Sequence, residues 1–243
     1  ATARPSIAQV TEGTVQISET DELKTVTGKG FTAKFSLKDG SLYSLVYGDK
    51  TIIADGNGPK LDAFRAFTNN DNWFYGSWFE RGLHNLKHKA TSSKVKVNKD
   101  GTATLAFTVV SQAPNAARIL GGTSSGLNKV EELTKRKFDE NDFRFVTNQI
   151  WTVYADGSIE LQSSITANES KFILPRLGYA ITVPSEFSKF SYYGRGPVEN
   201  YADRKTAQFV EKYESTVAAQ FANFPKPQEM ANREDVRWCA LTD

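Results

Sequence analysis

The stretch FRFVTNQIWTVYADGSIELQSSITA, residues 143–167, decides the fold of this chain. Two runs rich in apolar and β-branched residues, Phe143–Tyr154 and Ser158–Ala167, flank the turn Ala155-Asp156-Gly157. An Asp-Gly step between two such runs is among the strongest short-range signals of a β-hairpin. The stretch therefore predicts two antiparallel strands joined by a tight turn.

The same pattern recurs on both sides of this hairpin. Lys38-Asp39-Gly40 separates Phe31–Leu37 from Leu42–Tyr47, Gly48-Asp49-Lys50 leads into Thr51–Ala54, and Lys99-Asp100-Gly101 leads into Thr102–Val110. Because side chains alternate between the faces of a strand, alternate apolar residues from Phe31 to Leu37 share one face. Further strands are expected at residues 14–18, 25–27, 95–98, 176–183, 189–193 and 236–241. No helical repeat competes over most of the chain, and we predict an all-β fold, an antiparallel β-sandwich.

Three regions interrupt this pattern. Residues 72–90 are rich in aromatic residues but follow neither the helical nor the strand period. Residues 111–142 are interpreted as a solvated insertion that ends in a short helix or a charged hairpin arm at residues 129–137. Residues 214–232 are expected to be irregular and to wrap the edge of a sheet.

Bulk composition excludes several classes of protein. The 243 residues carry 30 basic and 28 acidic side chains, so no polyanion partner such as a nucleic acid is implied. Cys239 is the single cysteine, which excludes an intrachain disulfide, and no apolar run is long enough to span a membrane. The N-terminus is neither a signal peptide nor a start methionine, which suggests a piece cut from a longer chain. The compartment, cytoplasmic or periplasmic, is left open.

Residues 191–204, SYYGRGPVENYADR, are dense in glycine, aromatic and charged residues. Two glycines and a proline within four residues predict a tight, fixed turn, because glycine tolerates positive φ and proline locks φ. From the residues alone, this stretch is read as a turn whose charges satisfy one another and whose tyrosines cap the edge of a core.

Two further stretches are residues 62–71, DAFRAFTNND, and residues 227–238, PQEMANREDVRW. Together with residues 193–204 they resemble three motifs of the C-terminal domain of family 2 β-galactosidases. Residues 193–204 are similar to its G-x-G-P-x-E-N-Y-x-D-R signature, residues 62–71 to F-x-R-A-P-x-D-N-D, and residues 227–238 to P-Q-E-x-G-N-R-x-D-V-R-W. The matching residues with an expected structural role are Arg65, Gly194, Arg195, Gly196, Pro197, Glu199, Asn200, Tyr201, Asp203, Arg204, Glu229, Asn232, Arg233 and Trp238. The chain departs from the family at Phe67, where the motif has proline, and at Asn69, where it has an acidic residue.

The resemblance implies a galactose mutarotase-like supersandwich at residues 21–243, incomplete at its C-terminus, after a lead-in at residues 1–20. In the family, the catalytic glutamates lie in a central barrel domain that this chain does not contain, and the parent enzyme hydrolyses terminal β-galactosides with retention. The chain is therefore expected to be inactive alone, with its own barrel domain and the galactoside substrate as partners. No cofactor is predicted in this piece; Mg²⁺ and Na⁺ belong to the family's catalytic domain. A homo-oligomeric parent enzyme is compatible with the resemblance.

The loop after the second motif is the predicted contact with carbohydrate. Aromatic rings stack on the faces of sugar rings beside amide and carboxylate groups. In the family this loop lies beside the mouth of the active site, and the corresponding residues here are Asn70, Asp71, Asn72, Trp73, Tyr75 and Trp78. The alternative is that the loop folds its aromatic side chains back into a hydrophobic cluster.

Other ionisable residues are assigned structural roles. Glu199, Asp203, Glu229 and Asp235 each lie near an arginine of their own motif (Arg195, Arg204, Arg233 or Arg237), and pairing lowers the pKa of a carboxyl group. They are expected to fix turns. His84 and His88 are interpreted as surface histidines, since no acidic residue between them completes a metal site, and no metal site is predicted.

Two other functions compete with that of an accessory domain. One is a free-standing carbohydrate-binding sandwich with no partner enzyme. The other is an aldose-1-epimerase-type enzyme, which the fold permits but which needs a general acid and a general base in one pocket. The two histidines lie in one short segment outside the three motifs, and this disfavours the epimerase.

Overall fold

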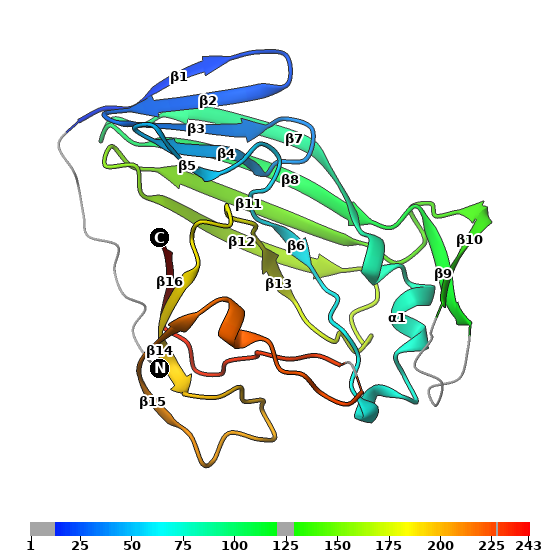
Figure 1. Ribbon diagram of the computed structural model, residues 1–243. Coiled ribbons are helices and arrows are strands. Elements are labelled where there is room, and N and C mark those ends of the chain that lie inside the picture. The colour runs from blue at the N-terminus through cyan, green and yellow to red at the C-terminus, as the bar shows by residue number, and fades with distance from the viewer. Residues whose placement is uncertain (1–12, 121–128, 227) are drawn as a thin grey trace.

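The computed structural model describes residues 13–120, 129–226 and 228–243, and these are almost entirely β-structure (Figure 1). Two antiparallel sheets face each other as a sandwich. The first has the strand order β1 (Gln16–Glu19), β2 (Leu23–Gly28), β3 (Phe31–Ser36), β4 (Leu42–Tyr47), β5 (Lys50–Ile53). The second has the order β12 (Ile159–Ala167), β11 (Phe145–Val153), β8 (Ala103–Gln112), β7 (Lys87–Val97). The predicted hairpin at residues 143–167 is confirmed, because β11 and β12 pair along their whole length.

The main core lies between these two sheets. Phe35 of the first sheet packs edge-on against Trp151 of the second, with ring centroids 5.6 Å apart. The indole nitrogen of Trp151 donates to the carbonyl oxygen of Gly40, and the Tyr47 hydroxyl donates to that of Gly157, so each sheet holds a turn of the other. Phe31, Ala33 and Phe35 are buried in this core, as their alternation predicts.

A second core lies at one end of the sandwich. The short helix α1 (Gly76–Glu80) packs against β9 (Asn115–Leu120), between the 3-10 turns η1 (Asn69–Asp71) and η2 (Leu83–Asn85). Its buried side chains include Trp78 and Phe79 of the helix and Phe143 and Phe145 next to it. β6 (Lys60–Asp62) and β13 (Gly178–Ala180) pair beside this core.

A third, three-stranded sheet lies below the sandwich in Figure 1. Its order is β15 (Phe209–Thr216), β14 (Lys189–Gly196), β16 (Trp238–Thr242), and the 3-10 turn η3 (Ala218–Gln220) follows β15. None of the helices in the described ranges is long and apolar enough to cross a bilayer.

The structure corrects the interpretation of residues 111–142. The segment continues as β8 and β9, and Ala113, Asn115 and Ala117 are buried, so its first part belongs to the fold instead of forming a solvated insertion. β10 (Lys129–Lys137) pairs with β9 and is the charged hairpin arm, not a helix. The tip of that arm and residues 1–12 of the predicted lead-in lie outside the described residues.

Three further differences from the sequence prediction concern residues 15–19, β13 and β15. Val15 is buried in the main core and β1 pairs with β2, so residues 15–19 of the predicted lead-in pack with the sandwich. β15 is a strand that the sequence did not predict, and only three residues of the expected strand at 176–183 form β13.

Candidate functional site

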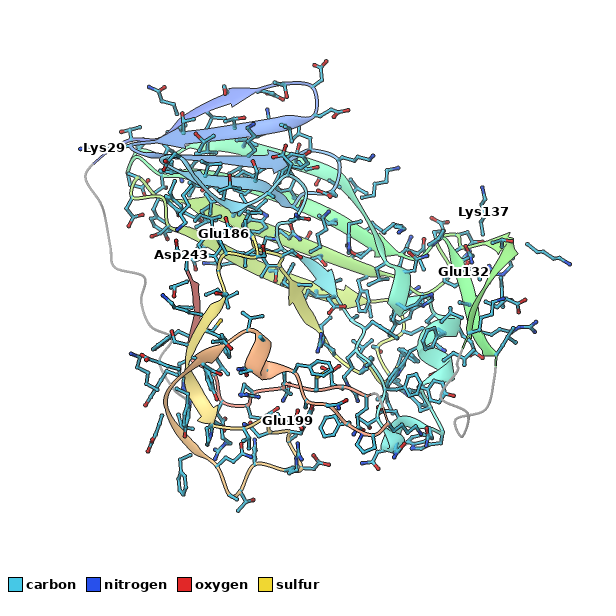
Figure 2. All side chains as sticks on the ribbon, viewed as in Figure 1. Lys29, Glu132, Lys137, Glu186, Glu199 and Asp243 are labelled. Carbon is cyan, nitrogen blue, oxygen red and sulfur yellow. The ribbon has the colours of Figure 1, made fainter. Side chains whose placement is uncertain are left out.

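The three motif stretches, far apart in sequence, meet at one cleft of about 430 Å³. Its residues come from the loop after β6, from the loop after β14, and from the irregular segment before β16. Figure 2 labels Glu199 in the second of these. The residues that line the cleft are Arg65, Thr68, Asn70, Asp71, Glu199, Tyr201, Asp203, Arg204, Phe224, Gln228 and Glu229.

An ion pair fixes the first wall of the cleft. Arg65 donates two hydrogen bonds to the Asp71 carboxylate, 2.8 and 3.0 Å long, and further ones to the carbonyl oxygens of Ala66 and Pro175. Asp71 also accepts from the backbone amide and the hydroxyl of Thr68. Burial raises the pKa of Asp71, but the hydrogen bonds from Arg65 and Thr68 outweigh it and leave the pKa below its ordinary value. This carboxyl group is therefore ionised and fully occupied.

The loop that follows divides its aromatic residues between core and surface. Tyr75 and Trp78 are buried in the second core, Tyr75 stacks on Phe67 at 4.2 Å, and the Trp78 indole donates to the carbonyl oxygen of Ile173. Trp73 is 79% exposed, and it lines a separate hollow of about 460 Å³ together with Asn72. Of the predicted aromatic residues, only Trp73 presents its ring to solvent.

Asn200 organises the second wall. It is fully buried, and its amide nitrogen donates to the carbonyl oxygens of Arg195 and Val198 and to the side chain of Gln208. Its side-chain oxygen accepts from the backbone amide of Glu234, and its backbone pairs with Asn232. One asparagine therefore ties the loop after β14 to the segment before β16.

Close packing, not positive φ, explains the two glycines of the signature. Gly194 and Gly196 lie in β14, and neither is among the residues with positive φ. A Cβ on Gly194 would lie 2.9 Å from the Cα of Val236, and one on Gly196 would lie 2.2 Å from the Tyr192 hydroxyl oxygen. The turn predicted at these glycines is wrong: the strand runs through them and the chain leaves it at Pro197.

The carboxylates of the motifs are held in different ways. Arg195 binds Asp235 and lowers its pKa, and Arg204 donates to Glu199, whose other oxygen accepts from the amide of Ala231. Glu229 instead pairs with Arg176, which lies outside the motifs and also binds Asp62. The Asp203 carboxylate makes no hydrogen bond or ion pair within the part of the chain that the structure describes. The expected pairing with an arginine of the same motif is thus seen only for Glu199. Asp235 pairs with Arg195 of another motif, Glu229 pairs with Arg176 outside the motifs, and Asp203 has no partner among the described residues.

The roles of Arg233 and Trp238 also differ from expectation. Arg233 binds the Tyr192 hydroxyl and the side chain of Gln220, and it meets no carboxylate among the residues that the structure describes. Trp238 begins β16 with 44% of its surface exposed, so the prediction that it is a core residue is wrong. Pro227, the first residue of the third motif, lies outside the described residues.

The two histidines are partly buried, which corrects their interpretation as surface residues. The His84 ring packs against Phe64 and Phe79, and its Nε2 lies 3.0 Å from a carboxylate oxygen of Glu132. Figure 2 labels Glu132 on the β10 arm. His88 contacts the Ser111 hydroxyl, and burial lowers its pKa. The two side chains point to different partners, and the described residues contain no group of three or more metal-ligating side chains.

Several lining residues were not found from the sequence. Phe224 and Gln228 come from a segment without regular structure, and Thr68 acts through its backbone amide as much as its hydroxyl. No spacing rule links them to the other motifs, because only the tertiary fold brings the three segments together. The place of Gln228 in the third motif could have identified it as a lining residue, whereas nothing in the sequence points to Phe224.

Comparison with known proteins gives the family context. The family model described as beta galactosidase small chain matches residues 27–243. A β-galactosidase of Priestia megaterium is 26% identical over 241 residues, covering 99% of this chain and 20% of that protein. One of Halalkalibacterium halodurans is 26% identical over 90% of this chain and 19% of its own length. One of Lactobacillus delbrueckii subsp. bulgaricus is 34% identical over 36% of this chain and 8% of its own. The chain thus spans about a fifth of the length of the first two relatives.

Proposed function

The chain belongs to the beta galactosidase small chain family, and from that premise we propose that it is a non-catalytic, carbohydrate-associated part of a β-galactosidase-type glycoside hydrolase. It packs on a catalytic barrel that the rest of the enzyme supplies, and its loop 70–73 forms one wall of the sugar entrance. The reaction of the complete enzyme is the hydrolysis of terminal β-galactosides with retention.

The state of the carboxylates carries the non-catalytic part of this proposal. A retaining glycosidase needs two carboxyl groups about 5–5.5 Å apart, one of which must hold a proton at working pH. In the cleft, Arg65 and Thr68 keep the pKa of Asp71 below its ordinary value, and Glu199 and Glu229 are each bound by an arginine. Such pairing favours the ionised form and suits a fixed wall better than a general acid. Asp203 is then the one lining carboxylate without a partner among the described residues, and a single such group does not make the pair that the reaction needs.

The exposed ring of Trp73 supports a role for the loop at the sugar entrance. The ring stands at the surface, while Tyr75 and Trp78, within five residues of it, anchor the loop in the second core. An exposed aromatic ring on an anchored loop can stack on a sugar face without a large loss of conformational freedom. The family's Mg²⁺ and Na⁺ are assigned to the catalytic part, as the resemblance to family 2 β-galactosidases implies.

Hydrolysis of a chromogenic β-galactoside tests whether the chain is non-catalytic. We expect no turnover by the 243-residue chain alone and turnover by the complete enzyme that contains it. Turnover by the chain alone would contradict the proposal and make two of its carboxylates catalytic. Absence of turnover in the complete enzyme, with saccharide binding retained by the chain, would favour a free-standing binding module instead.

The loop is tested in the complete enzyme with Trp73→Ala. We expect a lower kcat/KM for the galactoside and an unchanged melting temperature, because Trp73 packs little surface against the protein. Phe209→Ala is the matched control, since Phe209 is also an exposed aromatic residue, at 70%, but lies on β15. Equal kinetic parameters for Trp73→Ala and the control would contradict the role of the loop.

A further inference from the structure

The cleft between the three motif segments retains polar groups that its internal network does not use. Asp71, Glu199 and Glu229 are bound by arginines, but Asp203 at the exposed rim has no partner within the described residues. The side-chain amides of Asn70 and Gln228 also line the cleft and make no hydrogen bond to the described part of the chain. These three groups, a carboxylate and two amides, are free to bind a ligand.

The walls that carry these groups are fixed without a ligand. The Arg65–Asp71 pair holds the first segment, and the buried Asn200 holds the second against the third. Lys226 donates to the side-chain oxygen of Asn69 at 2.7 Å, which ties the third segment back to the first. A cleft with walls fixed in this way loses little conformational freedom when it binds.

A buried hydroxyl in the wall also lacks a partner. The Tyr201 hydroxyl is shielded from solvent and makes no hydrogen bond within the described residues. Burial raises the pKa of Tyr201, and Glu199 and Glu229 raise it further, while the nearby backbone of Asn232 and the charge of Arg204 lower it. The pKa stays above its ordinary value, so the group is a neutral O–H donor. An unpaired buried hydroxyl costs free energy.

The charge of the lining selects against anions. Carboxylates outnumber guanidinium groups in it, and both lining arginines, Arg65 and Arg204, are already paired with carboxylates. No cationic group is therefore left to neutralise a phosphate or a sulfate. A free carboxylate accepts hydrogen bonds from neutral hydroxyl groups, and amides both donate and accept.

We infer that this cleft is a saccharide-binding site of the chain itself, which takes a neutral mono- or disaccharide. Asp203, Asn70 and Gln228 bind its hydroxyl groups, and the half-buried ring of Phe224 offers an apolar surface to a sugar face. The volume of about 430 Å³ lies in the range of small-molecule sites. The inference goes beyond the proposed function, since it requires no catalytic partner and does not use Trp73, which lines a different hollow.

Isothermal titration of the full 243-residue chain with galactose and lactose tests the inference. We expect saturable binding that Asp203→Asn weakens by about tenfold, because a hydrogen bond to a charged acceptor is stronger than one to a neutral acceptor. Asp49→Asn is the matched control: Asp49 is also an exposed turn aspartate without a hydrogen bond in the described structure, and it lies between β4 and β5. Asn70→Ala is a second variant at the cleft, and circular dichroism checks that each variant folds.

The possible results separate clearly. Binding that is weakened by Asp203→Asn and Asn70→Ala but retained in Asp49→Asn and Trp73→Ala supports the site. Binding that the cleft variants leave unchanged would place the saccharide elsewhere and overturn the inference. Failure of the folded chain to bind either sugar, or binding of Na⁺ or methylammonium in its place, would overturn it as well. The kcat/KM of Trp73→Ala in the complete enzyme tests the proposed function and is independent of these outcomes.

Discussion

Arg65 and Asp71 form a two-pronged ion pair across the first turn of the loop that leads to Trp73, and both side chains are largely buried, with 21% and 15% of their surface exposed. The pair fixes the start of the loop in one geometry. Because Asp71 also accepts from Thr68, its loss removes contacts on both sides of the turn. The exposed tryptophan therefore depends on a contact made two residues before it.

We expect Asp71→Asn to lower the free energy of unfolding by about 1–3 kcal/mol, since hydrogen bonds to charged groups are lost and Arg65 is left unpaired. Urea unfolding measures the change. Lys212→Ala removes the ion pair with Glu214, whose two side chains are both exposed, and should leave the stability nearly unchanged. The pKa of Asp71 is lower in the folded chain than in the unfolded chain. The ionised carboxylate therefore stabilises the fold fully above the unfolded carboxyl pKa of about 4, and this stabilisation is lost as the pH falls through the pKa of the folded chain. Equal costs for the two variants would contradict the anchoring role.

Asn200 should matter more to stability than Arg204, although both belong to the same signature. Asn200→Ala removes the hydrogen bonds that the fully buried Asn200 side chain makes and leaves its buried partners unpaired. We expect this to lower the free energy of unfolding by at least about 3 kcal/mol. Arg204 has 59% of its side chain exposed, so Arg204→Ala should cost about 1 kcal/mol or less. Chemical denaturation of both variants measures the two losses of stability. A larger loss for Arg204→Ala than for Asn200→Ala would contradict the central role of Asn200.

The β-sandwich was predictable because its hairpins are encoded locally. Asp39-Gly40, Asp100-Gly101 and Asp156-Gly157 each mark a turn between strands that the structure contains. β15 was missed because it alternates weakly and exposes Phe209, so it lacks an apolar face. β9 was missed because the Pro, Gly and Ser residues around it are typical of loops. Its burial comes from packing against α1, a tertiary contact that the local sequence does not reveal.

The candidate site was predictable only as separate pieces. The motifs identified Arg65, Asn200 and Glu199, but their meeting at one cleft depends on the packing of three distant segments. Pairing was predicted from nearness in sequence, which succeeded for Glu199 and Arg204 and failed for Glu229, whose partner Arg176 lies 53 residues away. Nearness in sequence says little about which cation a carboxylate meets once the chain has folded.

Ala231 stands where the third motif of the family has glycine, and its φ of 66° lies in the left-handed region. A Cβ is disfavoured there by about 1–2 kcal/mol. We therefore expect Ala231→Gly to raise the free energy of unfolding by about 1 kcal/mol. The gain from relieving backbone strain in the folded chain exceeds the entropic cost of giving the unfolded chain a glycine. Ala222→Gly is the control in the same segment, because Ala222 is not among the residues with positive φ, and it should lose about 0.5–1 kcal/mol. Destabilisation by both substitutions would contradict strain at Ala231.

His88 should make the stability of the chain fall between neutral and mildly acidic pH. Burial lowers its pKa, the charges of Lys60 and Lys87 lower it further, and Asp39 opposes them. The unfolded chain therefore takes up a proton near the ordinary histidine pKa of about 6.5, before the folded chain does, which favours unfolding until the lowered folded value is passed.

We expect His88→Gln to remove this part of the pH dependence. Urea unfolding of both proteins at about pH 7.5 and about pH 5 measures it, and the wild type should lose more stability than the variant, by at most about 1.4 kcal/mol per pH unit for one proton. The carboxyl groups titrate in both proteins, so the difference between the two losses isolates His88. Ser111→Ala is the control, because it removes the hydroxyl that contacts the ring and keeps the titrating group. A pH dependence that is the same with and without His88 would mean that the ring is protonated in the folded chain as easily as in the unfolded one.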